Sequence, residues 1–322
     1  MNIRLRAAAQ TIIAAFATCL IVVASAGAAT VVNGDFESGN LDGWQVVNDP
    51  SVSGSWFAYA GTTPPTGLGG EVPPPPAGNF AAITAQGGPG SHFLYQDIAL
   101  EPFYAHQLSL LAYYRSSGEM VVPSPDTLTT GFEEPENQQY RIDVIKPTAP
   151  ITTLEPVDIL ATVFATGTGA PVEMAATNFT VDLTPFAGQT VRLRFVEVDN
   201  NGPLNAGTDS VSIVSTPPSN AVMLGKPALN KKKGTAKLPV TVPGAGTLTI
   251  ADVKKSKKRI KAKTLTATAA GTLKLPVKPT KSARKTLENK GKLKLKVAVT
   301  FTPTGGLAAT VTKKLTLKLA PK

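Results

Sequence analysis

Few side chains of this 322-residue chain are suited to catalysis. The chain has two histidines, His92 and His106, and neither lies at a spacing typical of metal ligands. No serine occupies a G-x-S-x-G turn. A glycosidase needs two carboxylates that meet in space, but four acidic candidates also fit ordinary charges at strand edges: Glu101, Asp143, Glu197 and Asp199. The sequence therefore predicts a protein that is not an enzyme.

The single cysteine, Cys19, lies inside an expected export signal. Arg4 and Arg6 form a positive region, residues 11–23 form a short apolar region, and Ala-Gly-Ala at 26–28 fits a cleavage site. The apolar run is short for a span of about 20 residues. We therefore expect residues 1–28 to be a signal peptide, no later transmembrane segment, and a mature chain without thiols that is secreted, extracellular or cell-wall associated.

Charge divides the chain into two unlike parts. Residues 226–322 hold 25 Lys or Arg against only Asp252 and Glu288, a net charge of +23. Since the whole chain carries +10, the remainder carries −13, or about −15 without Arg4 and Arg6 of the signal. The sequence STPPSN at 215–220 is typical of a linker. We expect a domain at 29–215, a linker at 216–225 and a second domain at 226–322.

Short alternating runs between turn-rich breaks predict an all-β first domain, an antiparallel sandwich. In residues 107–115, Leu108, Leu110, Ala112 and Tyr114 fall on one face, and Gln107, Ser109, Tyr113 and Arg115 fall on the other. Two proline-containing breaks, at 62–78 and 123–137, are expected to be mobile surface loops. The predicted strands are 54–60, 79–84, 92–100, 107–115, 139–145, 158–166, 178–183, 191–199 and 209–215.

The second domain is predicted to be a smaller, Lys-rich β-sandwich. The sequence KLKLKV at 292–297 alternates strictly, which places three lysines on one face and Leu, Leu and Val on the other. Residues 282–290 fit either a short helix or a loop. The predicted strands are 238–242, 246–251, 272–277, 292–301 and 308–319.

Four stretches in the first domain carry a family resemblance. They read VVNGDFESGNLDGW at 31–44, HFLYQDI at 92–98, YAHQLSLLAYYR at 104–115 and VRLRFVEVDNNGPLNAGTDSVS at 191–212. In this order they resemble the galactose-binding-like β-jelly-roll family, which includes many carbohydrate-binding modules. The resemblance implies an antiparallel jelly-roll sandwich in which Phe36 and Trp44 belong to the core.

The same resemblance implies a structural Ca²⁺ held between Glu37 of the first motif and Asp209 of the last strand. A hard cation prefers clustered oxygen ligands, and backbone carbonyls would supply the rest. The alternative is that both are carboxylates of a turn and a strand start, with no metal.

Glycan binding is the function that the resemblance implies for the first domain. Such modules stack planar aromatic side chains on sugar rings and place polar groups nearby. The candidates here are Trp56, Tyr95, Tyr113 and Arg115, of which Tyr113 and Arg115 share the polar face of one predicted strand. The alternative for the three aromatic residues is packing in the core or on a plain surface.

The basic second domain would attract any polyanion. Nearly all its charge is lysine and Phe301 is its sole aromatic residue, which disfavours specific nucleic-acid readout. It resembles Lys-rich β modules at the ends of secreted bacterial proteins, whose role is not established. Attachment to a cell-wall polyanion and a merely soluble spacer both remain open.

Together these features predict a secreted, non-catalytic surface protein. We expect it to bind glycan through the jelly-roll domain and anionic cell-wall polymer through the basic domain. The alternative is a purely structural cell-envelope protein with no specific ligand. The oligomeric state stays open.

Overall fold

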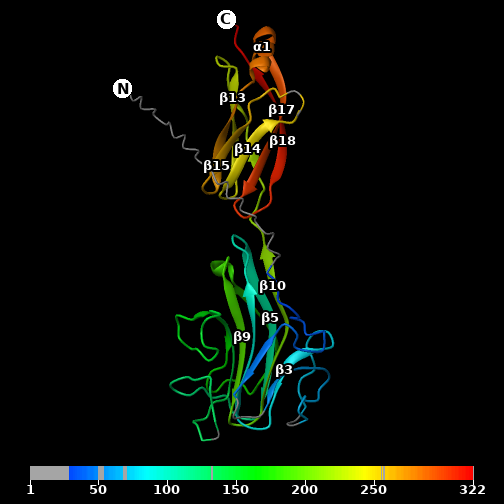
Figure 1. The fold of residues 1–322 in the computed structure, drawn as a ribbon, viewed down its shortest axis with the longest axis vertical. Coiled ribbons are helices and arrows are strands. Elements are labelled where there is room, and N and C mark those ends of the chain that lie inside the picture. Colours follow the sequence, from blue (N-terminus) through cyan, green and yellow to red (C-terminus); the bar gives the residue numbers. More distant parts are fainter. Residues whose placement is uncertain are drawn as a thin grey trace, which may run out of the picture.

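The computed structural model describes residues 29–49, 54–67, 71–131, 133–254, 256 and 258–321. The expected signal peptide, 1–28, lies outside these residues. Two β-sandwiches follow one another along the long axis of the molecule (Figure 1). This confirms the all-β sandwich fold class that the sequence predicts. No helix in the described part of the chain is long and apolar enough to span a membrane.

Two antiparallel five-stranded sheets form the first sandwich. One, the β4–β9 sheet, has the order β1-β4-β9-β6-β7, and the other, the β5–β10 sheet, has the order β2-β3-β10-β5-β8. Consecutive strands repeatedly cross between the sheets, as in a jelly roll. The strands are β1 Gln45–Asn48, β2 Ser55–Tyr59, β3 Ala81–Ala85, β4 Gly90–Ala99, β5 Ala105–Ser116, β6 Gln139–Ile145, β7 Ile159–Ala165, β8 Glu173–Asp182, β9 Thr190–Asp199 and β10 Leu204–Thr216, with a short 3-10 helix at Thr184–Phe186.

Aromatic side chains fill the space between these two sheets. The rings of Phe36 and Trp44 stack at 5.6 Å, and Trp44 meets Phe195 edge-on at 5.7 Å. The predicted placement of Phe36 and Trp44 in the core is confirmed. The alternation predicted for 107–115 is also confirmed, because Leu108, Leu110, Ala112 and Tyr114 all lie in this core.

Long connections between the strands cover part of the outer face of each sheet. Val72, from the proline-rich break, packs with Tyr59, Ile83 and Tyr113 on the outside of the β5–β10 sheet. Leu128, Ile151 and Leu154 pack with Phe93 and Val196 on the outside of the β4–β9 sheet. The expectation of mobile surface loops therefore needs correction, because the described parts of both breaks bury apolar side chains against strands.

Two further antiparallel sheets around one apolar core form the second sandwich. One has the order β11-β13-β12 with β16 also paired to β13, and the other has the order β15-β14-β17-β18. Leu293, Leu295 and Val297 are buried while the lysines between them are exposed, as predicted. The strands are β11 Met223–Leu224, β12 Ala228–Asn230, β13 Thr235–Val242, β14 Gly246–Asp252, β15 Lys263–Ala267, β16 Gly271–Val277, β17 Lys292–Pro303 and β18 Ala309–Lys318.

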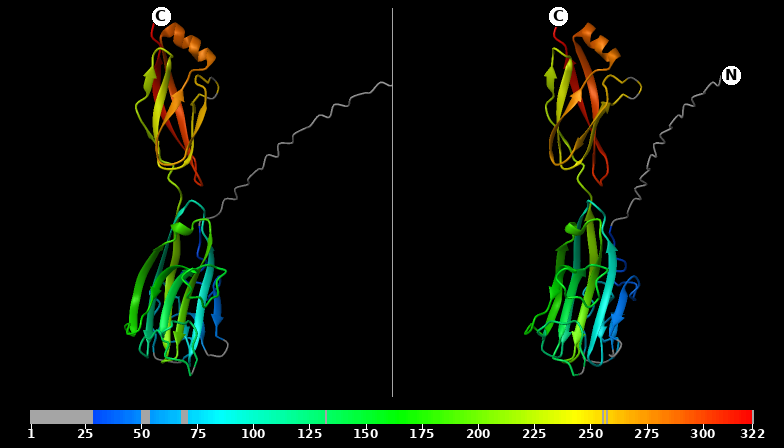
Figure 2. Two further views of the ribbon diagram at one scale, coloured as in Figure 1. Left: turned by 90° about the vertical axis from the view of Figure 1, so that its left-hand side faces the viewer. Right: turned by 60° about the vertical axis from the view of Figure 1, so that its left-hand side comes forward.

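One helix, α1 (Lys281–Lys290), lies at the end of this sandwich farthest from the first (Figure 2). The hydroxyl of Thr280 accepts a hydrogen bond from the Ala283 N–H, which caps its N-terminus. Gly291 ends it in the left-handed conformation at φ 61°, which glycine adopts without steric cost. Leu287 anchors the helix in the core.

The connection between the sandwiches is short. The expected linker, 216–225, contains β11, which pairs with β13, so only the residues between Thr216 and Met223 are free of strand pairing. The Asn220 amide donates to the Leu307 carbonyl at 3.0 Å. The exposed ring of Phe103, from the first sandwich, lies where a side chain at Gly305 of the β17–β18 turn would stand.

Candidate cation site and ligand-binding surfaces

Glu37 holds the segment that enters β3. Its Oε1 accepts the backbone N–H groups of Asn79 at 2.7 Å and Phe80 at 3.0 Å, and its Oε2 accepts the Asn79 amide at 3.3 Å. These N–H groups of Phe80 and Asn79 lower the pKa of Glu37. Gly78 has φ 59°, and a Cβ there would overlap the Glu37 carboxylate. The close approach therefore requires glycine.

Asp209 of β10 reaches the same segment from the opposite chain end. Its Oδ2 accepts the Ala77 N–H at 3.0 Å and its Oδ1 accepts the Ser210 N–H. Burial raises the pKa of Asp209 to about 6, although these N–H groups lower it, and the nearby charge of Glu37 adds to the rise. Ser210 has φ 51°, at the irregularity where the β5–β10 register shifts. Both predicted metal ligands thus converge on residues 77–80.

The residues at 37 and 209 fit a hard cation in type. Two carboxylates converge without a Lys or Arg partner among the described residues. However, their oxygens also accept backbone N–H groups, so the two chain ends are already fastened by hydrogen bonds. The described residues contain no group of three or more His, Cys, Asp or Glu arranged for a metal. Ca²⁺ at this place stays a prediction.

Trp56 is not available to a ligand. It is 2 % exposed, lies in the core beside Phe195 at 6.1 Å, and donates its ring N–H to the His92 carbonyl at 3.1 Å. The expectation that it contacts glycan therefore needs correction. The sequence did not show which face of its strand Trp56 occupies. Its place in the core becomes clear only when β2 pairs with β3.

Tyr113 lies on the outer face of β5, as predicted, but the proline-rich segment covers it. It is 1 % exposed, and its hydroxyl is 2.7 Å from that of Tyr59, which bonds the Pro73 carbonyl. Burial raises the pKa of Tyr59 to about 12, and it also raises that of Tyr113. Tyr113 is therefore a support for the covering segment and not a platform for sugar.

Arg115 is exposed, and its guanidinium donates to the Glu71 carbonyl at 2.8 Å. It fastens the same covering segment. Tyr95 lies on the other sheet, in β4. The four predicted ligand residues thus do not form one surface: one is in the core, two hold the segment over the β5–β10 sheet, and one remains on the β4–β9 sheet.

Around Tyr95 the structure assembles a polar surface, which we call the Tyr95 patch: Tyr95, Asp97 and Arg192. The Arg192 guanidinium lies over the Tyr95 ring at 4.2 Å and makes two bonds to Asp97, at 2.7 and 2.9 Å. The bonds to Asp97 raise the pKa of Arg192, although partial burial opposes them. Sequence reasoning named Tyr95 but missed its two partners. Asp97 lies two residues further along the same face of β4, and Arg192 joins them only through the β4–β9 register.

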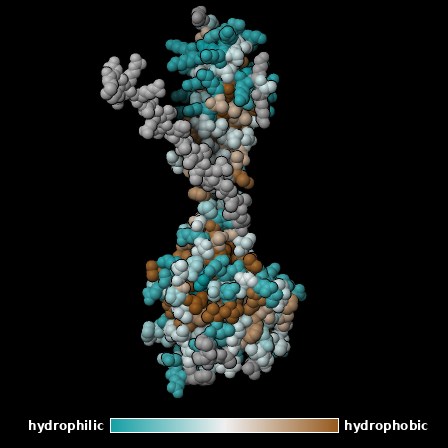
Figure 3. Space-filling view, in the orientation of Figure 1, coloured by the Kyte–Doolittle hydropathy of each residue, from teal (hydrophilic) through white to brown (hydrophobic). Residues whose placement is uncertain are grey.

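A second surface, which we call the lysine face, consists of Lys292, Lys294 and Lys296 of β17 and Lys314 and Lys318 of β18, all exposed. In the antiparallel register, Lys296 stands directly opposite Lys314, and Lys292 opposite Lys318. Like charges in directly opposed positions destabilise a sheet. Hydrophilic side chains gather over this sandwich in Figure 3.

A groove of about 460 Å³, the lysine groove, lies between this face and the segment that follows β14. Its charged lining is Lys254, Arg259, Lys294, Lys296 and Lys314. The segment is fastened by Asp252, whose carboxylate accepts the Arg259 guanidinium at 3.1 and 3.2 Å. Burial raises the pKa of Asp252, but the bonds from Arg259 and Lys254 outweigh it, so the net shift is downward.

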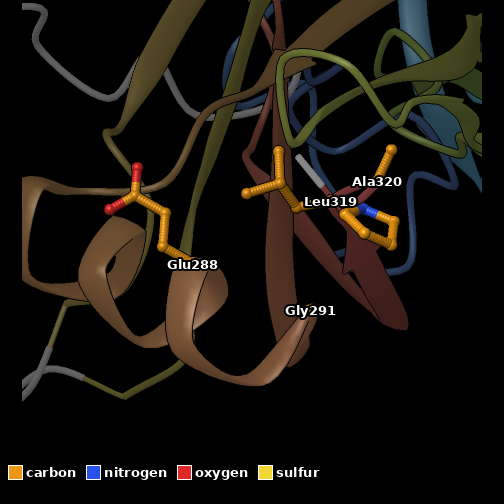
Figure 4. A pocket seen from close by; sticks show the side chains of 5 residues that line it. Glu288, Gly291, Leu319 and Ala320 are labelled. Atoms are coloured by element: carbon orange, nitrogen blue, oxygen red, sulfur yellow. The ribbon is translucent and has the colours of Figure 1, made fainter.

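The basic charge is almost wholly uncompensated. In residues 226–322 the two carboxylates, Asp252 and Glu288, are each paired with an arginine, Arg259 and Arg284. A separate hollow of about 550 Å³ lies between the end of α1 and Leu319 (Figure 4). Its one ionisable lining group, Glu288, is the partner of Arg284. That hollow therefore offers no convergent polar groups.

No protein-family model matches the chain, and no curated protein matches it. Among solved structures, it is similar to the K3 cleaved adhesin domain of Lys-gingipain from Porphyromonas gingivalis, with TM-score 0.37 and 16% identity over 58% of this chain and 98% of that one. The module TmCBM61 in complex with β-1,4-galactotriose matches with TM-score 0.34 and 10% identity over 56% and 94%. The adhesin domain of Epf from Streptococcus pyogenes matches with TM-score 0.32 and 11% identity over 76% and 78%. At these scores the matches carry no argument about what this chain binds.

Proposed function

We propose that this chain is a secreted, non-catalytic surface protein that attaches to an anionic polymer, such as a cell-wall polyanion, through the lysine groove. The observation that carries the proposal is the direct opposition of Lys296 and Lys314 beside Lys294 and Arg259. Such an arrangement opposes folding, whereas a bound polyanion turns each of these charges into an attractive contact. Four lysines and one arginine line the groove, whereas the other basic residues of the second sandwich lie outside it.

Binding to dextran sulfate, with neutral dextran of equal size as reference, tests this proposal. We expect the triple variant K294Q/K296Q/K314Q to lose about 3 kcal/mol, or roughly a hundredfold in affinity, at about 1 kcal/mol for each lysine. The matched control K237Q/K274Q/K278Q removes the same charge from β13, β16 and the residue that follows β16, all exposed. An equal loss in both variants would show that charge alone, and not the groove, retains the polymer.

A second proposal concerns glycan binding at the Tyr95 patch. The Arg192 guanidinium is stacked on the Tyr95 ring and makes two hydrogen bonds to the Asp97 carboxylate. The guanidinium, the carboxylate and the Tyr95 hydroxyl are therefore fixed close to one aromatic ring. That combination suits sugar hydroxyls and ring carbons together. On the same face of the sheet, Leu128, Ile151 and Leu154 pack over Phe93 and Val196.

A glycan array with Y95A and R192M tests the second proposal. We expect both variants to lose about tenfold in affinity for any glycan that the wild-type chain binds, from about 1.4 kcal/mol of lost stacking and hydrogen bonding. F103A, which changes an exposed aromatic residue elsewhere, is the control. Unchanged binding in Y95A, or binding to no glycan at all, would leave the structural envelope role as the alternative for this sandwich.

We also propose that Ca²⁺ binds between Glu37 and Asp209. The support is the convergence of two carboxylates on residues 77–80, where neither has an ion-pair partner among the described residues. Such an ion would neutralise the two carboxylates, which the backbone N–H groups bind but do not neutralise. We expect a chelator to lower the melting temperature of the wild-type chain more than that of E37Q. An identical chelator effect on both would rule out Glu37 as a ligand.

A further inference from the structure

Three buried polar side chains meet inside the first sandwich, at one end of its core. Glu197 and Asp199 point from the same face of the central strand β9, and Gln86 follows directly after β3. They are 0 %, 2 % and 2 % exposed. The reading of Glu197 and Asp199 as strand-edge charges therefore needs correction, as it does for Asp143 and Glu101, which are also buried.

The amide of Gln86 joins the two carboxylates. Its Nε2 donates to Glu197 Oε1 at 3.1 Å and to Asp199 Oδ2 at 2.9 Å, and it also contacts the Leu204 carbonyl. An amide nitrogen carries only two hydrogens, so it cannot satisfy all three acceptors at once. Among the described residues, no hydrogen bond reaches the remaining side-chain oxygens, Gln86 Oε1, Glu197 Oε2 and Asp199 Oδ1, which are fully buried. The Leu204 and Gly90 N–H groups do lie close enough to the Asp199 carboxylate to lower its pKa.

Charge is also uncompensated here. Neither Glu197 nor Asp199 forms an ion pair with a described Lys, Arg or His. Burial raises the pKa of Asp199 to about 7 and that of Glu197 well above its usual value, with the charge of Asp199 adding to the latter. Elsewhere in the same sandwich the buried Asp143 is paired with Arg194 at 2.7 Å. This cluster therefore differs from an ordinary buried ion pair.

A small hollow leads to Asp199 from outside. It measures about 130 Å³ and is lined by Asp199 and by two glycine-containing turns, with Gly87 and Gly88 on one side and Asn200 and Gly202 on the other. A water molecule occupies about 30 Å³ in the liquid, so the hollow is large enough for an ion with a few waters. The Gly202 and Pro203 carbonyls already accept hydrogen bonds from Gln138 and Ser117, so additional oxygen ligands for an ion would come from the opposite turn and from water.

We propose that Gln86, Glu197 and Asp199 form a binding site for a hard divalent cation, Ca²⁺, at the end of the first sandwich. Three unpartnered side-chain oxygens, two of them carboxylate, are the donor type that Ca²⁺ prefers, and turn carbonyls and water complete its six to eight ligands. The site shares no residue with the Glu37 and Asp209 pair. An ion here would join β9, the end of β3 and the turn before β10, three segments far apart in the sequence.

Calorimetric titration with CaCl₂ after chelator treatment tests the site in a background that lacks the other one, E37Q/D209N. We expect this background to bind Ca²⁺ in a single class of site, and we expect that binding to be lost when E197Q and D199N are added. E173Q, which neutralises an exposed carboxylate on β8, is the control and should leave the titration unchanged. Equal titrations with and without E197Q and D199N, including no heat in either, would overturn the proposal.

Melting of the E197Q variant supplies a second readout that a merely structural role does not move. Without Ca²⁺, Gln at 197 replaces a carboxyl whose charged form is disfavoured by burial, and it keeps the shape. In the E37Q/D209N background, E197Q should therefore melt at or above the temperature of its parent. With Ca²⁺ the order should reverse, because only the parent gains the ion. If E197Q is the less stable protein in both conditions, Glu197 is a structural acceptor and the cation site is refuted.

Discussion

The two sandwiches treat charge in opposite ways. Among the described residues, the first buries an arginine and five carboxylates, and the second buries one carboxylate: Arg194, Glu101, Asp143, Glu197, Asp199 and Asp209 against Asp252. The second keeps its lysines on the outside and closes around aliphatic residues and Phe301. A buried charge requires a partner wherever it lies, whereas an exposed lysine is free to meet a ligand. The first sandwich therefore has charged groups buried in its interior, and the second has them exposed on its surface, in the lysine groove.

Loss of a buried partner should produce the largest effect, in the first sandwich. Arg194 bonds Asp143 at 2.7 Å and the Thr153 carbonyl at 3.0 Å, and neither charged side chain is exposed. We expect R194M to lower the free energy of unfolding by about 3–5 kcal/mol. Asp143 and the Thr153 carbonyl both lose a charged donor in a buried place, and Asp143 keeps Arg141 and the Thr162 hydroxyl as partners. Urea unfolding followed by tryptophan fluorescence reports on this sandwich alone, since Trp44 and Trp56 are the only tryptophans.

R194M/D143L is the control for this prediction, because it removes both charges. It should recover much of the stability that R194M loses, since no buried carboxylate then remains there, and Arg141, which is partly exposed, keeps Asp126 at 3.9 Å. A double variant no more stable than R194M would mean that shape, and not charge, is what Arg194 contributes. The first sandwich would then be stabilised, like the second, mainly by the packing of its core.

The covering segment over the β5–β10 sheet should respond more weakly. Y113F removes the hydroxyl that lies 2.7 Å from that of Tyr59, while Tyr59 keeps its bond to the Pro73 carbonyl. We expect a loss of about 1 kcal/mol from one buried hydrogen bond, measured by the same fluorescence. Y104F, on a Tyr outside that contact, serves as the reference. Equal stability of Y113F and the wild-type chain would show that the Tyr113 hydroxyl does not help to hold the segment.

Local alternation in the sequence was enough to predict many strands and their faces. The KLKLKV stretch and residues 107–115 repeat every second residue, so their buried and exposed sides follow from the pleat. The short helix at 281–290 was one of two readings, and its Thr280 cap and Gly291 end decide it. Strands β1, β11, β12 and β15 were missed, because they are short and nearly all their residues are exposed or only partly buried.

Contacts between distant segments were not predictable in the same way. Tyr113 is buried because the proline-rich segment returns across β5, and a strand pattern does not show what covers its outer face. Arg192 meets Tyr95 and Asp97 only in the β4–β9 register. Glu37 and Asp209 were predicted as a pair from the family resemblance, and they do reach the same segment. The ion between them is still a prediction.

Acid should weaken the second sandwich through its one buried carboxylate. The folded-state pKa of Asp252 lies below that of the unfolded chain. Its contribution to stability is therefore complete above about pH 4, the unfolded value, and is lost as the pH falls through the folded value. We expect the calorimetric transition of this sandwich to move to lower temperature at acid pH in the wild-type chain and to move less in D252N. The same acid shift in both would assign it to other groups.

The smallest effect should have the opposite sign, and it separates binding from stability on the lysine face. K314T removes the charge directly opposite Lys296, and threonine suits an exposed strand position. We expect K314T to stabilise the second sandwich by about 0.2–1 kcal/mol at low salt, and less at high salt because salt screens exposed charges. K313T is the reference, since Lys313 points elsewhere and bonds the Leu224 carbonyl at 3.1 Å. A K314T protein that is both more stable and weaker in binding dextran sulfate would show that the opposed lysines serve a ligand at the expense of the fold. If K314T is less stable at low salt, the lysine face does not oppose folding, and the main support for the lysine groove as a polymer site disappears.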